Sequence, residues 1–276
     1  MPFTPAMQPE TIGQQLLRSV KLYAKSLLHV FEFALILSII AFVPRMITLV
    51  TNQRIPLTLS PFTLQTLGLL LIDIGTLIFF IAILWRMRCF IAHVQETLWS
   101  DIKRAFRKIP QILVASLILG FSLLLINFVT YGVNLLITQD TLLTQNSFAR
   151  LAVFVVFFFQ FIAAVYIYFL FCFYLPLILT ENKSIVSSLK QSAVLVWKNW
   201  WRTFCVQVFP WFCYLIALFI IKHVLDFHLH IYFTDPRNIT VSSTAMHIII
   251  FALFIPWPAA TLLVQLRDLE LRKNLY

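Results

Sequence analysis

The stretch that decides the fold is LAVFVVFFFQFIAAVYIYFLFCFYL, residues 151–175, which contains no charged residue. A helix rises about 1.5 Å per residue, so this run is long enough to cross the roughly 30 Å hydrocarbon core of a membrane. A β-barrel is the other structure that spans membranes, but its strands appear as short segments of alternating polarity. The uninterrupted run therefore predicts a transmembrane helix.

Five further stretches have a similar length and apolar character, and they lie on both sides of the first. They are residues Leu27–Val50, Thr63–Trp85, Ile112–Ile137, Thr203–Ile221 and Ala245–Leu266. Together the six stretches predict an all-α polytopic membrane protein, with residues 1–276 forming one integral membrane domain. Pro256 and Pro258 should distort the last span, because proline removes a helical hydrogen bond.

The composition agrees with a lipid environment. Of 276 residues, 61% are hydrophobic and only 12% are charged, and the mean hydropathy is +0.89. Soluble domains carry about 25% charged residues, so this chain has too few to cover a soluble surface. The four cysteines show no metal-ligand spacing and are interpreted as free apolar thiols.

The positive charges predict which side of the membrane each connector faces. Sixteen of the 21 lysines and arginines lie in the N-terminal segment, the second and fourth connectors and the C-terminal tail. The positive-inside rule places these segments, and therefore both chain ends, in the cytoplasm. Because the charge is explained by topology and anionic lipid, a net charge of +10 does not predict nucleic-acid binding.

Three segments on the predicted cytoplasmic side each form an amphipathic helix that runs into a span, namely residues 11–31, 97–117 and 184–204. They suggest a threefold repeat of an interfacial helix and a transmembrane hairpin, over residues 11–85, 97–175 and 184–266. The alternative is that any chain entering a membrane needs a basic amphipathic start. Such helices lie among lipid headgroups, and their cations favour anionic lipid. The candidate headgroup-binding residues are Arg18, Lys21, Lys25, Lys103, Arg104, Arg107, Lys108, Lys190, Lys198 and Arg202.

Motifs in the third segment and the tail resemble a known group of membrane proteins. They are residues 174–184 (YLPLILTENKS), 188–192 (SLKQS), 198–202 (KNWWR) and 266–273 (LRDLELRK). The chain resembles the YciC-like bacterial inner-membrane proteins and the membrane domain that precedes some bacterial glycerophosphoryl diester phosphodiesterases. The tail departs from that pattern at Gln265-Leu266-Arg267, where a tyrosine is expected. The resemblance implies a six-span protein of the bacterial inner membrane. The phosphodiesterase chemistry belongs to a separate soluble barrel, so that activity is not expected here.

No constellation of residues predicts catalysis, and no cofactor or metal site is expected. Asp73 lies near the middle of the second predicted span, with Arg45, Asn127 and Gln160 as possible partners at similar depth. An intramembrane acid is a candidate for proton-linked or substrate-linked transport, but we favour an interhelical hydrogen bond or ion pair that holds the helices together. A His-x-His pair at residues 228–230 with Asp226 is a weak metal signal, and a hydrated interfacial segment also accounts for it.

The sequence thus favours a non-enzymatic membrane protein that engages anionic lipids, with a role in membrane homeostasis. A transporter or channel for a lipid or small amphiphile is the main alternative. A membrane-embedded enzyme lacks the polar residues that its chemistry would need. Protein partners and oligomeric state are not predicted.

Overall fold

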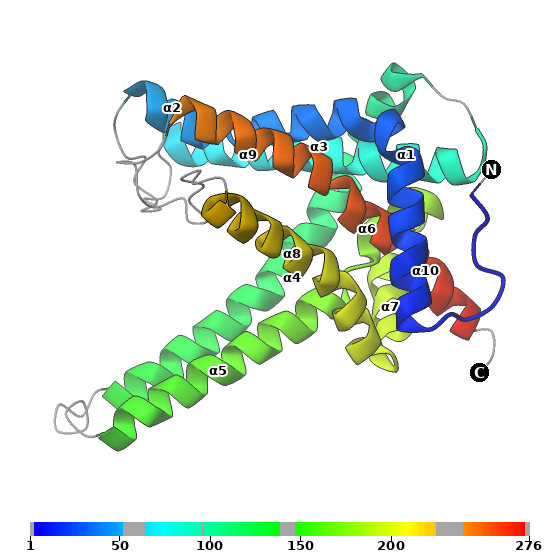
Figure 1. The fold of residues 1–276 in the computed structure, drawn as a ribbon. Coiled ribbons are helices and arrows are strands. Elements are labelled where there is room, and N and C mark those ends of the chain that lie inside the picture. The colour runs from blue at the N-terminus through cyan, green and yellow to red at the C-terminus, as the bar shows by residue number, and fades with distance from the viewer. Residues whose placement is uncertain (1–2, 52–63, 95–96, 139–146, 225–239, 274–276) are drawn as a thin grey trace. The chain divides into compact units, whose positions relative to one another are not determined.

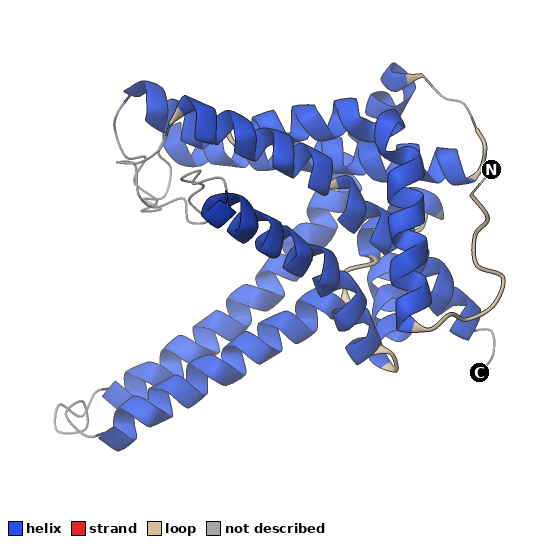
Figure 2. Cartoon of the chain, viewed as in Figure 1, coloured by secondary structure: helices blue, strands red, loops and turns tan. Residues whose placement is uncertain are grey.

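A computed structural model describes residues 3–51, 64–94, 97–138, 147–224 and 240–273. Within these ranges every regular element is a helix (Figure 2). The helices are α1 (Ile12–Ala41), α2 (Val43–Thr51), α3 (Leu64–Ile91), α4 (Leu98–Thr138), α5 (Ser147–Leu170), α6 (Tyr174–Thr180), α7 (Ile185–Trp197), α8 (Trp200–Val224), α9 (Val241–Phe254) and α10 (Pro256–Lys273). Among the described residues, six helical stretches are long and apolar enough to cross a membrane. The predicted all-α polytopic fold is confirmed.

The first predicted span, Leu27–Val50, is divided. Helix α1 ends at Ala41, and the N–H of Phe42 bonds back to the carbonyls of Ser38 and Ile39. Pro44 follows in the first turn of α2, where its missing N–H costs no helical hydrogen bond. The helix is therefore interrupted at Phe42, and Arg45 belongs to the short helix α2.

The predicted span Leu151–Leu175 is also interrupted, because α5 ends at Leu170 and α6 begins at Tyr174. Pro176 cannot donate the backbone hydrogen bond that would continue α5 through this point. Ser192 of α7 stabilises the break: its hydroxyl donates to the Leu170 carbonyl at 2.9 Å and accepts from the Phe173 N–H at 3.2 Å.

The predicted distortion of the last span is confirmed, since α9 ends at Phe254 and α10 starts at Pro256. Two other prolines are tolerated inside long helices, Pro110 in α4 and Pro210 in α8. Proline in a span thus interrupts the helix at some positions and leaves it continuous at others.

The chain divides into two compact units, each described here by itself. The first unit comprises Met1–Ile109 and Cys205–Tyr276. In this unit α1 packs against α3, α9 and α10 (Figure 1). Aromatic contacts join α8 to the α9–α10 pair, with the Tyr214 and Phe254 rings stacked 4.5 Å apart.

The packing face of α1 mixes small and polar residues with the large apolar side chains of Leu22, Val30, Phe33 and Leu37. Its buried positions include Gln15, Ser19 and Ser26, and each is fully enclosed. Small residues let helices approach closely inside a membrane, where apolar side chains are equally well solvated by lipid. At Gly75 of α3 the approach is so close that a Cβ atom would lie 3.2 Å from the Ile40 side chain of α1.

The second unit, Pro110–Phe204, contains a long helical hairpin with a very different surface. Helices α4 and α5 run alongside each other (Figure 1), and most of their large side chains are exposed. The exposed set on α5 includes Phe154, Phe157, Phe158, Phe159 and Phe161. Helix α7 packs on α5 and α6 at the other end of this unit.

The amphipathic segments are helical as predicted, and two of them are continuous with their spans, in α1 and α4; the third forms the separate helix α7. Of the apolar stripes, Ile12 and Val20 of the first segment lie on the surface, whereas Ala105 and Ile109 of the second and Val196 of the third are buried within the protein. Each segment buries a polar residue and a small residue one turn apart: Gln15 and Ser19, Asp101 and Ala105, and Ser188 and Ser192. This shared pattern accords with the threefold repeat, which remains a prediction.

Candidate functional site

The most strongly basic region with a defined geometry is the hairpin between α3 and α4. Arg86 on α3 forms an ion pair with Asp101 on α4 at 2.7 Å, and the Asp101 side chain is fully buried. Helix α3 ends at Ile91, and His93, two residues later, has a φ of 56° in the left-handed region. The buried ion pair therefore sets how the first turns of α4 sit against the end of α3.

Trp85 provides a flat surface for two further cations in the same hairpin. The guanidinium of Arg104 lies 4.1 Å from the Trp85 ring centroid, and that of Arg88 lies 5.2 Å from it. Cation–π contacts of this kind hold an arginine in place without neutralising its charge. The α3–α4 hairpin thus presents several fixed positive charges around one buried acid, Asp101.

Four of the predicted headgroup-binding cations are exposed and take part in no ion pair with another described residue: Lys21 on α1, Lys103 and Arg107 on α4, and Lys190 on α7. Each belongs to an amphipathic segment that leads towards a span. Their ammonium and guanidinium groups are available to anionic ligands.

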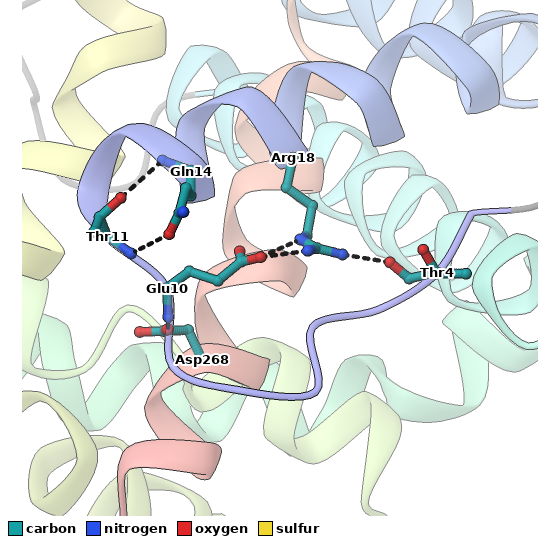
Figure 3. Close-up of polar contacts among 6 residues, drawn as sticks. All are labelled: Thr4, Glu10, Thr11, Gln14, Arg18 and Asp268. Atoms are coloured by element: carbon teal, nitrogen blue, oxygen red, sulfur yellow. Dashed lines mark hydrogen bonds and ion pairs between the residues drawn. The ribbon is translucent and has the colours of Figure 1, made fainter.

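The other predicted cations are placed differently. Lys25, Arg104 and Lys198 are exposed but have additional contacts, whereas Lys108 and Arg202 are half-buried. Arg18 is committed to the protein: it pairs with Glu10, and its Nη1 donates to the Thr4 carbonyl at 2.5 Å (Figure 3). Arg18 is therefore a structural residue rather than an available headgroup ligand.

The Arg18 contacts belong to a polar cluster that the sequence did not reveal, and that fastens the N-terminal segment to α10. Asp268 is fully buried and accepts the Glu10 N–H at 2.6 Å (Figure 3). Its other oxygen accepts from Arg272 Nε at 2.8 Å, and Arg272 Nη2 donates to the Glu10 carbonyl at 2.7 Å. Thr11 caps α1 through reciprocal hydrogen bonds with Gln14. The cluster joins the two ends of the chain.

Two of the predicted intramembrane polar residues form a pair. The Gln160 amide of α5 donates to the Asn127 side-chain oxygen of α4, and the Asn127 amide donates to the Leu123 carbonyl. Beside this pair lies a groove of about 390 Å³ lined by apolar side chains of both helices, together with Thr130 and Gln160. The Asn127–Gln160 pair thus links α4 to α5 beside this apolar groove.

The other two predicted intramembrane residues do not meet each other. Asp73 is exposed on α3, and its carboxylate has no hydrogen bond or ion pair with a described residue. Arg45 is buried and bonds to His247 and Ser243 of α9. The possible Asp73–Arg45 pair is thus absent from the described contacts, and Arg45 lies instead against the buried His247.

The metal hypothesis for the His-x-His pair falls outside the described residues, since residues 225–239 are not among them. Within the described part of the chain there is no group of three or more histidine, cysteine or acidic side chains that could hold a metal ion. All four cysteines are free thiols.

Comparison with known proteins gives one match. No curated protein and no solved structure matches the chain. The matching family model covers residues 100–265, from the start of α4 to the middle of α10, which is more than half of the chain. The chain belongs to the family described as "Domain of unknown function (DUF7847)".

Proposed function

We propose that this multi-pass membrane protein is a non-enzymatic protein of the bacterial inner membrane that binds anionic lipid headgroups on its cytoplasmic side. The observation that carries the proposal is the exposure of Lys21, Lys103, Arg107 and Lys190 without an ion-pair partner among the described residues. On a soluble protein such cations would be solvated by water. Here the four cations lie where amphipathic helices lead towards spans, close to lipid headgroups.

The chemistry of this position favours lipid phosphate as the ligand. Each basic residue close to an anionic bilayer contributes about 1 kcal/mol to the attraction. The buried Trp85 ring holds Arg104 and Arg88 in place, which keeps two further positive charges near Lys103 and Arg107. The resemblance to six-span inner-membrane proteins supports cytoplasmic placement of both ends and a role in membrane homeostasis.

Native mass spectrometry of the protein released from mild detergent, with identification of bound lipid, tests the proposal. The test variant replaces all four exposed cations by glutamine: Lys21→Gln, Lys103→Gln, Arg107→Gln and Lys190→Gln. We expect at least a tenfold loss of retained anionic phospholipid, because four contributions of about 1 kcal/mol are removed.

The matched control keeps every charge and changes only the side chains: Lys21→Arg, Lys103→Arg, Arg107→Lys and Lys190→Arg. It should retain anionic lipid as the wild type does. Equal retention by the glutamine variant and the wild type would contradict the proposal. A loss in both variants would show that shape, and not charge, holds the lipid.

A second candidate function is transport of a lipid or other amphiphile, and the groove between α4 and α5 favours it. The groove is apolar except for Thr130 and Gln160, as an acyl chain with one polar group would require. Proton-coupled transport would also use Asp73. Flux of a fluorescent phospholipid across reconstituted vesicles should then be abolished by Asp73→Asn, and unchanged flux would exclude a role for that carboxylate.

A further inference from the structure

A buried arginine in the first unit has no described counter-charge. Arg45 has only 6% of its surface exposed. Its Nη1 lies 3.0 Å from His247 Nδ1, and its Nη2 donates to the Ser243 hydroxyl at 3.1 Å. Its Nε is buried and makes no hydrogen bond.

The partners of Arg45 are neutral. A guanidinium has only donor groups and stays protonated in proteins, so His247 Nδ1 must be the acceptor and the ring proton sits on Nε2. None of the ion pairs among the described residues includes Arg45. A buried charge without a counter-charge is strongly destabilising, so this arrangement calls for an anion.

The surroundings add positive potential instead of neutralising it. Ser243 and His247 lie in the first two turns of α9, and a helix N-terminus carries a partial positive charge. Thr240 caps α9 in a reciprocal capping box with Ser243, so the backbone of the first turn is fixed. The Ser243 N–H is already bonded to Thr240, so the start of α9 contributes its partial positive charge, and Arg45 supplies the donors that favour an oxyanion.

Aromatic contacts of Phe42 hold the residues around Arg45 in place. The Phe42 ring lies 5.0 Å from the His247 ring and 5.9 Å from the Phe251 ring. Phe42 is also the residue at which α1 ends and the chain turns into α2. The break between the helices therefore positions Arg45 against α9.

We propose that Arg45, with Ser243 and the start of α9, binds a phosphate oxyanion. The planar guanidinium matches the paired oxygens of a phosphate group. A phosphate that took the place of the His247 acceptor would exchange a neutral hydrogen bond for a charge-assisted one. The ligand is either the phosphodiester of a phospholipid headgroup or inorganic phosphate. The site is distinct from the basic helix starts, because Arg45 precedes a connector predicted on the opposite membrane side.

Thermal unfolding of the full chain in maltoside micelles, followed by tryptophan fluorescence, is the first arm of the test. Inorganic phosphate about tenfold above its dissociation constant should raise the unfolding temperature by roughly 2–4 °C relative to sodium chloride of equal ionic strength. Arg45→Gln should abolish the rise. Lys222→Gln, which removes an exposed cation from the end of α8, should leave it unchanged.

Native mass spectrometry of the same proteins is the second arm, and it separates the two phosphate sources. Phospholipid that is retained by the wild type and the Lys222→Gln control, but lost in Arg45→Gln, identifies a headgroup ligand. A phosphate-dependent rise without Arg45-dependent phospholipid identifies a free anion.

Ser243→Ala keeps the charge of Arg45 and removes one of its hydrogen-bond partners, so it serves if Arg45→Gln does not fold. Ser243→Ala should at least halve the phosphate-dependent rise in unfolding temperature or the amount of retained phospholipid, according to which of the two the wild type shows. The proposal is overturned if neither phosphate nor phospholipid binding depends on Arg45 or Ser243, or if the wild type shows no binding in either arm.

Discussion

The last span and the fourth span are both long and apolar, but the protein surrounds them to very different extents. In the most apolar part of Val241–Lys273, 67% of residues are buried within the protein, against 6% in Leu151–Thr180. Helix α10 buries Thr261, Gln265 and Asp268, whereas α5 exposes a row of phenylalanines.

The difference shows what holds a membrane protein together when lipid is as apolar as its side chains. Apolar surface alone gives no preference for protein over lipid, so close packing and interhelical hydrogen bonds decide which helices associate. Around α10 such bonds are numerous: Gln207 donates to Gln265 at 2.7 Å, and Trp257 donates to Ser19 at 3.2 Å. Among the described side chains, α5 has one comparable bond to α4, from Gln160 to Asn127.

The largest expected effect is at Asp268, the buried acid of the α10 cluster. Asp268→Ala should lower the free energy of unfolding by about 3 kcal/mol, because it leaves Arg272 without its carboxylate and the Glu10 N–H without its acceptor. Unfolding in detergent micelles by titration with a denaturing detergent measures this. Glu270→Ala, two residues away in a more exposed pair, should cost less than about 0.5 kcal/mol. Equal losses in the two variants would contradict the assigned importance of the cluster.

A smaller effect should separate two serines with the same local hydrogen bond. Ser26 on α1 donates to the Leu22 carbonyl and is fully buried, and Ser122 on α4 donates to the Ile118 carbonyl at the hairpin surface. Ser26→Leu should lower the free energy of unfolding by about 2 kcal/mol through overpacking. Ser122→Leu should change it by less than about 0.5 kcal/mol. If Ser122→Leu were the more damaging, the hairpin surface would have to be covered by protein and not by lipid.

The smallest expected effect is the coupling between Asn127 and Gln160. A double-mutant cycle with Asn127→Leu and Gln160→Leu should give an interaction energy of about 0.6 kcal/mol, typical of hydrogen bonds between transmembrane helices. The same unfolding assay measures it. An interaction energy near zero would mean that the pair does not hold α4 to α5.

The sequence was sufficient for the spans because length and hydropathy determine insertion. The uncharged run at residues 151–175 and the Pro256-Trp257-Pro258 distortion were both predictable from single stretches. The breaks at Phe42 and at Phe171–Phe173 were not, because proline interrupts these helices but not α4 or α8. The outcome depends on partners such as Ser192, which lie far away in the sequence.

The packing faces could not be predicted for a related reason. An apolar stripe marks the buried face of a helix in water, but in lipid it marks no particular face. In α1 the signal was present in Gln15, Ser19 and Ser26, which recur at helical spacing among apolar residues. Arg45 and His247 are 202 residues apart, and their pairing needed the folded chain.

Side-specific labelling of single cysteines tests the central claim most directly, namely that the exposed cations of the three amphipathic segments lie on one membrane face. Lys21→Cys, Lys103→Cys and Lys190→Cys, each in a background without the four native cysteines, would be exposed to an impermeant maleimide in oriented vesicles. The account predicts that all three are labelled from the cytoplasmic side and that Lys222→Cys is labelled from the opposite side. Labelling of any of the three from the same side as Lys222→Cys would contradict it.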